Sequence, residues 1–374
     1  MKKITAVASS LALIGACGFA KEISIGLPMP ITGSIAAYGQ TAYDGVKLAN
    51  QIEPTLKNGD TVKLVLVDTK GDKVETATAT TRLITSDKVS GIIGALTTGN
   101  TQQVLMIAED KKIPVIAPAA TADKLLDNKK FGSRVCFMDS LQGTALATYA
   151  AEKLNAKTAV VVVDQAQTYS LGLAKAFEKE FKAKGGKIAK KLTISSGDKD
   201  FKAVVAQLKD INADIVYLPI YHPEASMLAR QARQIGVKSL LASGDGVANS
   251  TFIELGGEAV NGYIYTDTFD YTQPPTQRSK DFLDAYANAN GGKRDIPGFT
   301  AQGADAYFIM VKAMNECDDP SDSVCVNEKI HQTKDFDGVS GIISIDATGN
   351  AMRSVVIKEI KDLKATYKDT VNPK

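Results

Sequence analysis

The strongest constraint on the fold is an alternation of short, continuously apolar segments with amphipathic helical ones. In the first third of the chain the strand candidates are residues 23–26, 62–67, 91–94 and 113–116, and the helix candidates are 40–52, 74–84 and 102–109. Strands buried on both faces read as continuous apolar runs, and parallel strands need a crossover helix between them. The pattern therefore predicts a parallel sheet covered by helices on both faces.

The same rhythm starts again after about residue 140. Its strand candidates are 159–163, 188–194, 215–218 and 240–242, and its helix candidates are 173–184, 201–209 and 224–234. A chain of 374 residues is long for one ordinary domain. We expect two α/β lobes with a cleft between them, and ligands in such folds bind beyond the carboxyl ends of the strands.

The N-terminus has the pattern of an export signal, which predicts a periplasmic protein. Lys2 and Lys3 precede the apolar segment 4–14, and Gly18 and Ala20 supply the small residues that a signal peptidase requires. We expect residues 1–20 to be a signal peptide that is cleaved after Ala20.

Two alternatives remain for this segment. Residues 14–17 resemble a lipobox, in which Cys17 would carry a lipid, but the tether left before the first strand would be short. A buried N-terminal strand or helix is disfavoured, because residues 21–26 already read as the first strand.

Charge and apolar runs exclude other classes. Without residues 1–20 the chain has 44 − 2 = 42 Lys plus Arg against 42 Asp plus Glu, so it is formally neutral. No basic patch indicates a nucleic-acid partner, and no later apolar run reaches the length of a membrane span. We expect a monomer.

Three cysteines follow the predicted signal. Cys317 and Cys325 flank a polar, turn-rich stretch, and such a pair in an exported protein predicts a disulfide. A metal site there is disfavoured because no His lies beside them. Cys136 has no evident partner and is expected to be a buried core residue.

Polar and aromatic residues gather after predicted strands. An amino-acid zwitterion needs hydroxyls and backbone N–H groups for its carboxylate and an acid for its ammonium. Thr98 and Thr121 bring hydroxyls near predicted strand-to-helix turns, and Asp245 is an acid on a glycine-rich loop. The tyrosines near strand exits are Tyr38, Tyr169 and Tyr221.

Each of these residues also has an ordinary structural interpretation. A Thr at a helix start is usually an N-cap, and an Asp between glycines is usually a turn former. A buried Tyr is usually part of the core, with its hydroxyl at a polar partner. Spacing alone therefore does not settle a binding role.

Ordered short motifs carry a family resemblance over residues 22 to about 350. They are Pro30-Ile31-Thr32-Gly33 with Tyr38-Gly39, Thr101-Gln102, Pro118-Ala119-Ala120-Thr121-Ala122, Lys199-Asp200-Phe201, Tyr221-His222-Pro223-Glu224, Arg230-Gln231-Ala232-Arg233 and Gly246-Val247-Ala248-Asn249. In this order the chain resembles the bacterial leucine/isoleucine/valine-binding proteins, the substrate-binding components of branched-chain amino acid ABC transporters.

The resemblance implies the type I periplasmic-binding-protein fold, with two doubly wound α/β lobes joined by a three-strand hinge. Crossovers are expected near 139–142, 266–270 and 345–350. Lobe 1 would then comprise 21–140 plus 270–346, and lobe 2 would comprise 141–269 plus 347–374.

The resemblance also implies a ligand site. Thr98 matches a family serine at the ligand carboxylate, and Asp245 matches a family glutamate at the ammonium. Ala119 and Thr121 match the loop that serves the zwitterion. The remaining positions are second-lobe aromatics, Tyr169 and Tyr221, and the side-chain pocket, Tyr38, Leu96 and Phe299.

Three departures put the preferred side chain in doubt. Thr97 replaces a half-cystine of some members, the loop before Tyr169 is one residue longer, and Asp245 is one methylene shorter than glutamate. We expect a branched-chain amino acid, with another neutral amino acid, a short amide or an aromatic acid as alternatives. Besides a membrane permease, a chemosensory receptor is a possible recipient of the loaded protein.

An enzyme is disfavoured. The chain lacks a Ser-His-Asp constellation, a phosphate-binding glycine loop and a metal-ligand cluster, and it has two histidines, His222 and His331. We therefore expect no catalytic residue, no metal and no cofactor.

Overall fold

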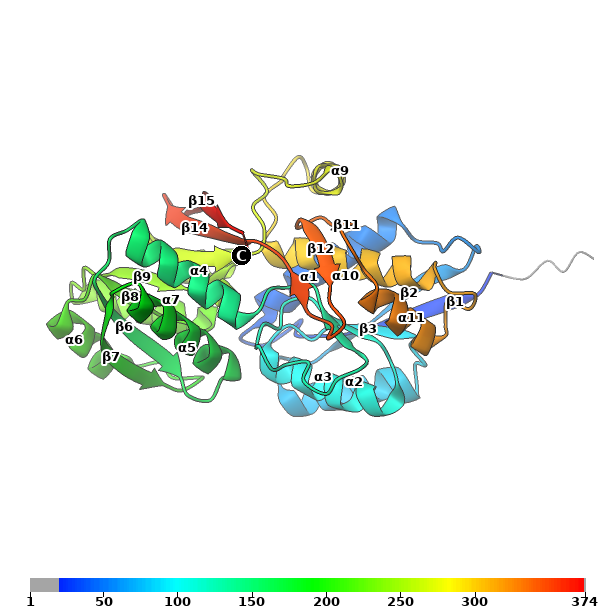
Figure 1. Cartoon of the computed structure of the whole chain (residues 1–374), viewed down its shortest axis with the longest axis horizontal. Helices are drawn as coiled ribbons and strands as arrows, with labels where there is room; N and C mark the ends of the chain where they lie inside the picture. Colours follow the sequence, from blue (N-terminus) through cyan, green and yellow to red (C-terminus); the bar gives the residue numbers. More distant parts are fainter. Residues whose placement is uncertain (1–19, 373–374) are drawn as a thin grey trace, which may run out of the picture.

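The computed structural model describes residues 20–372 as two α/β lobes lying side by side (Figure 1). Residues 1–19 of the predicted signal peptide, Cys17 among them, lie outside the described residues. The first lobe is built on a five-stranded parallel sheet in the order β2-β1-β3-β4-β5. Its strands are β1 (Glu22–Met29), β2 (Thr61–Asp68), β3 (Gly91–Ile93), β4 (Val115–Ala117) and β5 (Gly132–Arg134).

The second lobe is built on a seven-stranded mixed sheet in the order β15-β14-β10-β9-β8-β6-β7. The strands from β10 to β7 are parallel, whereas β14 is antiparallel to both of its neighbours. They are β6 (Thr158–Asp164), β7 (Lys187–Ile194), β8 (Ile215–Tyr217), β9 (Leu240–Ser243), β10 (Ile264–Asp267), β14 (Val355–Lys361) and β15 (Lys364–Val371).

Helices cover the sheets of both lobes, as the sequence pattern predicts. Those packed on the first sheet are α1 (Ala36–Ile52), α2 (Lys73–Thr85), α3 (Thr98–Lys111) and α10 (Gly298–Met314). Helix α9 (Gln277–Ala289) packs on α1, and α11 (Ser323–His331) packs on α10. Those of the second lobe are α4 (Asp139–Glu152), α5 (Thr168–Ala183), α6 (Lys202–Ile211), α7 (His222–Gln234) and α8 (Ser250–Gly256).

The C-terminal third returns to the first lobe before it joins the second. Helices α9 to α11 are followed by a small antiparallel sheet, β11 (Phe336–Asp337), β12 (Ile342–Ile345) and β13 (Ala351–Met352). Because β13 pairs with β12, the third connection runs through Arg353 and Ser354, a few residues beyond the expected 345–350.

Buried charged groups hold the connections between the lobes. Lys358 Nζ lies 3.1 Å from Asp267 Oδ2 and 3.3 Å from Asp270 Oδ2, and all three side chains are buried. Arg353 donates to the carbonyl oxygens of Val135 and Ser340. Paired and hydrogen-bonded in this way, these charges tolerate burial.

Two glycines allow α1 and α10 to cross in close contact. A Cβ atom on Gly45 would lie 1.9 Å from the Thr300 carbonyl oxygen, and one on Gly303 would lie 2.2 Å from that of Ala42. Any larger residue would push the helices apart. The tight crossing fixes where the first turn of α10 meets the first turn of α1, at the edge of the site described next.

The predicted disulfide is confirmed. Cys317 and Cys325 are bonded, with their Cα atoms 6.0 Å apart. Cys136 is a free, buried cysteine, also as predicted, and burial raises the pKa of its thiol to about 12.

Candidate functional site

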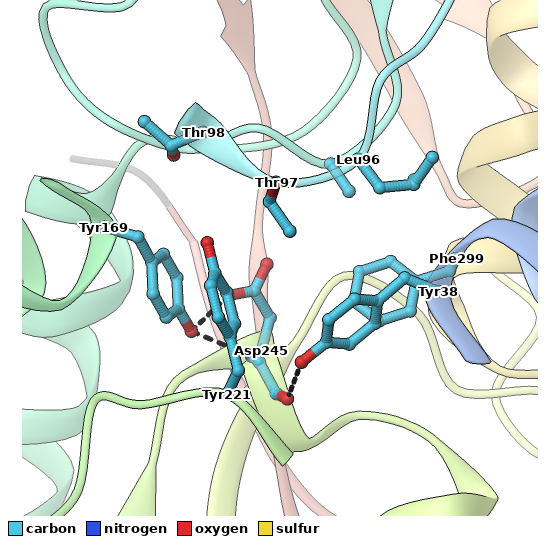
Figure 2. A pocket seen from close by; sticks show the side chains of 10 residues that line it. Tyr38, Leu96, Thr97, Thr98, Tyr169, Tyr221, Asp245 and Phe299 are labelled. Atoms are coloured by element: carbon cyan, nitrogen blue, oxygen red, sulfur yellow. Dashed lines mark hydrogen bonds between the residues drawn. The ribbon is translucent and has the colours of Figure 1, made fainter. Parts of the chain in front are cut away.

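A small cavity of about 20 Å³ lies between the lobes (Figure 2). Both lobes contribute to its wall, and nearly every contributing segment follows the carboxyl end of a parallel strand. This is the ligand position expected of open α/β sheets. The lining residues are Tyr38, Leu96, Thr97, Thr98, Ala119, Tyr169, Tyr221, Asp245, Gly246 and Phe299.

The first lobe provides the hydroxyl side of the cavity through the turn between β3 and α3. Thr98 is the first residue of α3, and Thr97, the N-cap, makes no side-chain capping bond. The Thr98 Oγ1 atom is buried and has no hydrogen-bond partner among the described residues. A buried hydroxyl without a partner is costly, so a ligand acceptor at this point would stabilise it.

The second lobe provides a carboxyl group on the loop after β9. Asp245 begins a short 3₁₀ turn and is 4% exposed. Its Oδ1 atom accepts hydrogen bonds from Tyr169 Oη at 2.9 Å and from Gln142 Nε2 at 3.1 Å. Because both bonds end on Oδ1, Oδ2 is the oxygen available to a ligand.

Burial dominates the electrostatics of this carboxyl group. It raises the pKa of Asp245 to about 7, although the hydrogen bonds from Gln142 and Tyr169 act in the opposite direction. This carboxyl group has no counter-ion among the described residues. A ligand cation at this point would favour the ionised form.

Aromatic rings form the walls around Asp245. Tyr169 and Tyr221 are stacked with centroids 4.9 Å apart and an interplanar angle of 11°. Burial raises the pKa of Tyr221, and the nearby backbone N–H of Thr98 acts in the opposite direction. Tyr221 Oη nevertheless makes no hydrogen bond of good geometry with the described residues. A polar group of a ligand could therefore approach this hydroxyl from the cavity.

The opposite end of the cavity is apolar. Tyr38 and Phe299 pack edge to face with centroids 5.3 Å apart, and Leu96 lies beside them (Figure 2). The crossing of α1 and α10 brings the two rings together. The cavity therefore has a polar end suited to charged groups and an apolar end suited to a small hydrocarbon side chain.

Direct hydrogen bonds join the lobes across the cavity. Tyr38 Oη donates to the Gly246 carbonyl oxygen at 2.5 Å and accepts from the His222 backbone N–H at 3.3 Å. Tyr38 belongs to the first lobe, whereas Gly246 and His222 belong to the second. The structure is thus a closed arrangement of the lobes.

All the predicted site residues except Thr121 line this cavity. Thr121 is fully buried in the loop between β4 and β5 rather than at a strand-to-helix turn. Its carbonyl oxygen accepts from the Asp139 backbone N–H at 2.8 Å. Burial raises the pKa of the Asp139 carboxyl group, and the nearby Thr121 hydroxyl acts in the opposite direction, but without a hydrogen bond of good geometry.

Sequence reasoning did not assign three residues to the site. Thr97 and Gly246 are direct neighbours of predicted residues, so the loops that carry them gave a usable signal. Gln142 had none, because its contacts with Asp245 span 103 residues. No group of three or more His, Cys, Asp or Glu suited to a metal ion occurs within residues 20–372.

Among the same residues, no helix is both long and apolar enough to cross a membrane.

Comparison with known proteins identifies the class to which this fold and this site belong. The family model of periplasmic binding proteins matches residues 22–365. The leucine-binding protein LivK of Thermotoga maritima has a crystal structure that superposes with a TM-score of 0.91 at 36% identity, covering 94% of this chain and 99% of that one. The chain is a periplasmic binding protein with the type I fold.

Its family can be stated more narrowly. The chain is 31% identical to the Leu/Ile/Val-binding protein of Citrobacter freundii, over 94% of each protein. The branched-chain amino acid transporter substrate-binding protein LivJ of Streptococcus pneumoniae, solved with isoleucine, is 30% identical with a TM-score of 0.88, covering 94% of this chain and 100% of that one. The chain belongs to the Leu/Ile/Val-binding protein family, and the predicted resemblance is confirmed.

Proposed function

We propose that this protein captures a branched aliphatic amino acid in the interlobe cavity and delivers it to the membrane permease of an ABC importer. The supporting observation is the polarity of the cavity. A buried carboxyl group, Asp245, and an unpaired hydroxyl, Thr98, lie at one end, and Tyr38, Leu96 and Phe299 lie at the other. The names of the relatives favour leucine, isoleucine or valine.

Each group of the zwitterion has a proposed partner. The ligand carboxylate binds the Thr98 hydroxyl and the backbone near Ala119. The ammonium binds Asp245, and Tyr169 and Tyr221 close over it. Thr121 supports this site from behind, through the loop that carries Ala119 and through its contact with Asp139.

Closure of the lobes completes the site. The ligand docks on the first lobe, and the second lobe then brings Asp245, Tyr169 and Tyr221 against it. Ligand shifts the population toward the closed form because only that form makes both sets of contacts. Each charge-assisted hydrogen bond contributes about 1.5–3 kcal/mol. A few of them reach micromolar affinity, on the order of −8 kcal/mol, after the cost of association.

The wider setting follows from the same family. Residues 1–20 act as an export signal, and the mature protein works in the periplasm as a monomer. We assign it no catalytic residue and no cofactor. Neutral amino acids of other shapes, short amides and aromatic acids are alternative ligands, because the Thr97 hydroxyl adds a polar group to the wall and Asp245 reaches less far than glutamate. Delivery to a chemosensory receptor is the alternative to delivery to a permease.

A thermal-shift screen of the twenty amino acids on refolded, ligand-stripped protein tests the proposal. Leucine, isoleucine or valine should raise the melting temperature more than glutamate, lysine or glycine, because a charged side chain would be buried against Tyr38 and Phe299 without a partner. The largest shift with a charged amino acid would refute the specificity. Turnover of the ligand during a long incubation would instead indicate an enzyme.

A further inference from the structure

Gln142 does not line the cavity, yet it donates a hydrogen bond to the same oxygen of the Asp245 carboxyl group as the lining residue Tyr169. It is fully buried in the first turn of α4. Its Nε2 atom donates to Asp245 Oδ1 at 3.1 Å and to Asp139 Oδ1 at 3.3 Å. Its Oε1 atom accepts from Thr266 Oγ1 at 2.7 Å and from the Asp245 backbone N–H at 3.2 Å.

These four bonds determine the orientation of the amide. The oxygen faces two donors, and the nitrogen faces two carboxyl oxygens. A flipped amide would direct its N–H groups at the Thr266 hydroxyl and the Asp245 backbone N–H, and its oxygen at the carboxyl groups. The side chain can therefore hold both the main chain and the carboxyl group of Asp245 in one geometry.

The position of Gln142 in the fold joins the site to the connections between the lobes. It comes a few residues after the segment 135–138, which links β5 of the first lobe to α4 of the second. Thr266 lies in β10, whose end at Asp267 leads into the segment that returns to α9 beside the first lobe. One amide thus contacts residues next to both connections and the acid of the cavity.

We propose that Gln142 is the positioning residue that sets both the orientation and the charge of Asp245, and thereby the pH above which the cavity accepts an ammonium ligand. The inference rests on the proposed function for the identity of that ligand. It goes further by assigning control of the site to a residue that does not touch the ligand.

The charge effect has a clear sign. An N–H donor stabilises the ionised carboxylate, so Gln142 lowers the pKa of Asp245 while burial raises it. Asp267 acts in the same direction as burial, because a neighbouring carboxylate disfavours ionisation of Asp245. The titratable groups facing Asp245 from the surrounding elements are Asp139, Tyr169, Tyr217, Tyr221, Asp267, Tyr38 and Cys136.

The test is the pH profile of leucine affinity for Gln142→Met, a variant of similar side-chain length without the amide. Calorimetric titrations between pH 5.5 and 8.5 should show the midpoint of the profile about one pH unit higher than in the wild type. Leucine affinity at pH 7 should fall at least about tenfold. A residue that only fills space would lower affinity equally at every pH and leave the midpoint in place.

Two further variants keep the result unambiguous. Thr266→Val has the same shape but removes one donor to the amide, so its midpoint should move in the same direction by a smaller amount, and it decides the matter if Gln142→Met does not fold. Gln231→Leu is the matched control. Its amide bonds Lys199 and Phe201 away from the cavity, so its midpoint should stay in place.

The inference and the proposed function fail in different ways. Loss of leucine binding in Asp245→Asn, with unchanged midpoints in Gln142→Met and Thr266→Val, would overturn the role of Gln142 alone. Wild-type affinity in Asp245→Asn would overturn the proposed ammonium site. NMR titration of the Asp245 carboxyl carbon in ligand-free protein gives the midpoint without any ligand, and an unshifted value in Gln142→Met would overturn the inference even if leucine does not bind.

Discussion

Replacing Asp245 with Asn separates the charge of this residue from its shape. The Asn oxygen can take the place of Oδ1 and keep the hydrogen bonds from Tyr169 Oη and Gln142 Nε2. The Asn nitrogen then occupies the Oδ2 position that faces the cavity. An amide donor there meets the ligand ammonium, so the variant loses an acceptor and gains a group that cannot pair with the ligand.

The expected loss follows from the strength of the bond removed. A charge-assisted hydrogen bond contributes about twice as much as a neutral one. In a cavity that excludes water, its removal should cost at least about 1.4 kcal/mol, which is tenfold in affinity. The ligand-free protein should not become less stable at pH 8. Because the pKa of Asp245 is raised to about 7, ionising this buried group opposes folding as the pH rises toward 7, and Asn removes that cost.

Calorimetric titration with leucine, beside the ligand-free melting curve, measures both quantities. An acid that merely shapes the turn would lose little on change to Asn, and binding would be unaffected. Unchanged affinity for leucine would therefore remove Asp245 from the site. A large drop in ligand-free melting temperature would show that the side chain has a structural role.

Three other predictions concern proton linkage, closure and the disulfide. Leucine affinity should rise with pH up to about 7 and then level off, because a bound ammonium favours ionised Asp245. The proton released on binding should make the binding enthalpy depend on the buffer, and an affinity that does not change with pH would contradict this linkage. Tyr38→Phe removes the hydroxyl bond to Gly246 and should weaken binding about threefold to tenfold, with a larger average radius of gyration in X-ray scattering at subsaturating leucine; unchanged values would exclude a role in closure. Replacing Cys317 and Cys325 with Ser should lower the free energy of unfolding by about 2–3 kcal/mol in urea titrations, and a change in leucine affinity would show that this remote loop affects the site.

Periodicity alone predicted the core of both lobes. The runs that became β3, β6 and β9 are apolar on every residue or nearly so, because both faces of these strands are covered, and that is the signal a sequence shows most clearly. The apolar periodicity predicts the starts of α1, α3 and α5 four or five residues later in the chain than the structure has them. The first turns of α1, α3 and α5 carry site residues rather than an apolar stripe.

The C-terminal third was less predictable. β11 and β13 are two residues long, too short for any periodicity, and β14 and β15 pair antiparallel at the edge of a sheet that is otherwise parallel. Such elements depend on partners distant in the chain.

The family resemblance, not the spacing, selected the site residues, and all of them except Thr121 line the one cavity. Gln142 remained unpredicted because neither the family resemblance nor its own sequence context pointed to it. A glutamine in a helix is ordinarily a solvent-facing residue, and only the sheet topology places it under Asp245.

The most direct test of the central claim is titration of leucine into refolded, ligand-stripped protein with small-angle scattering on the same samples. We predict one binding site per chain with micromolar or tighter affinity, together with a smaller radius of gyration at saturation as the lobes close over the ligand. The account would be contradicted if leucine, isoleucine and valine all failed to bind. It would also be contradicted if the ligand-free protein were open and its radius of gyration did not change when leucine bound.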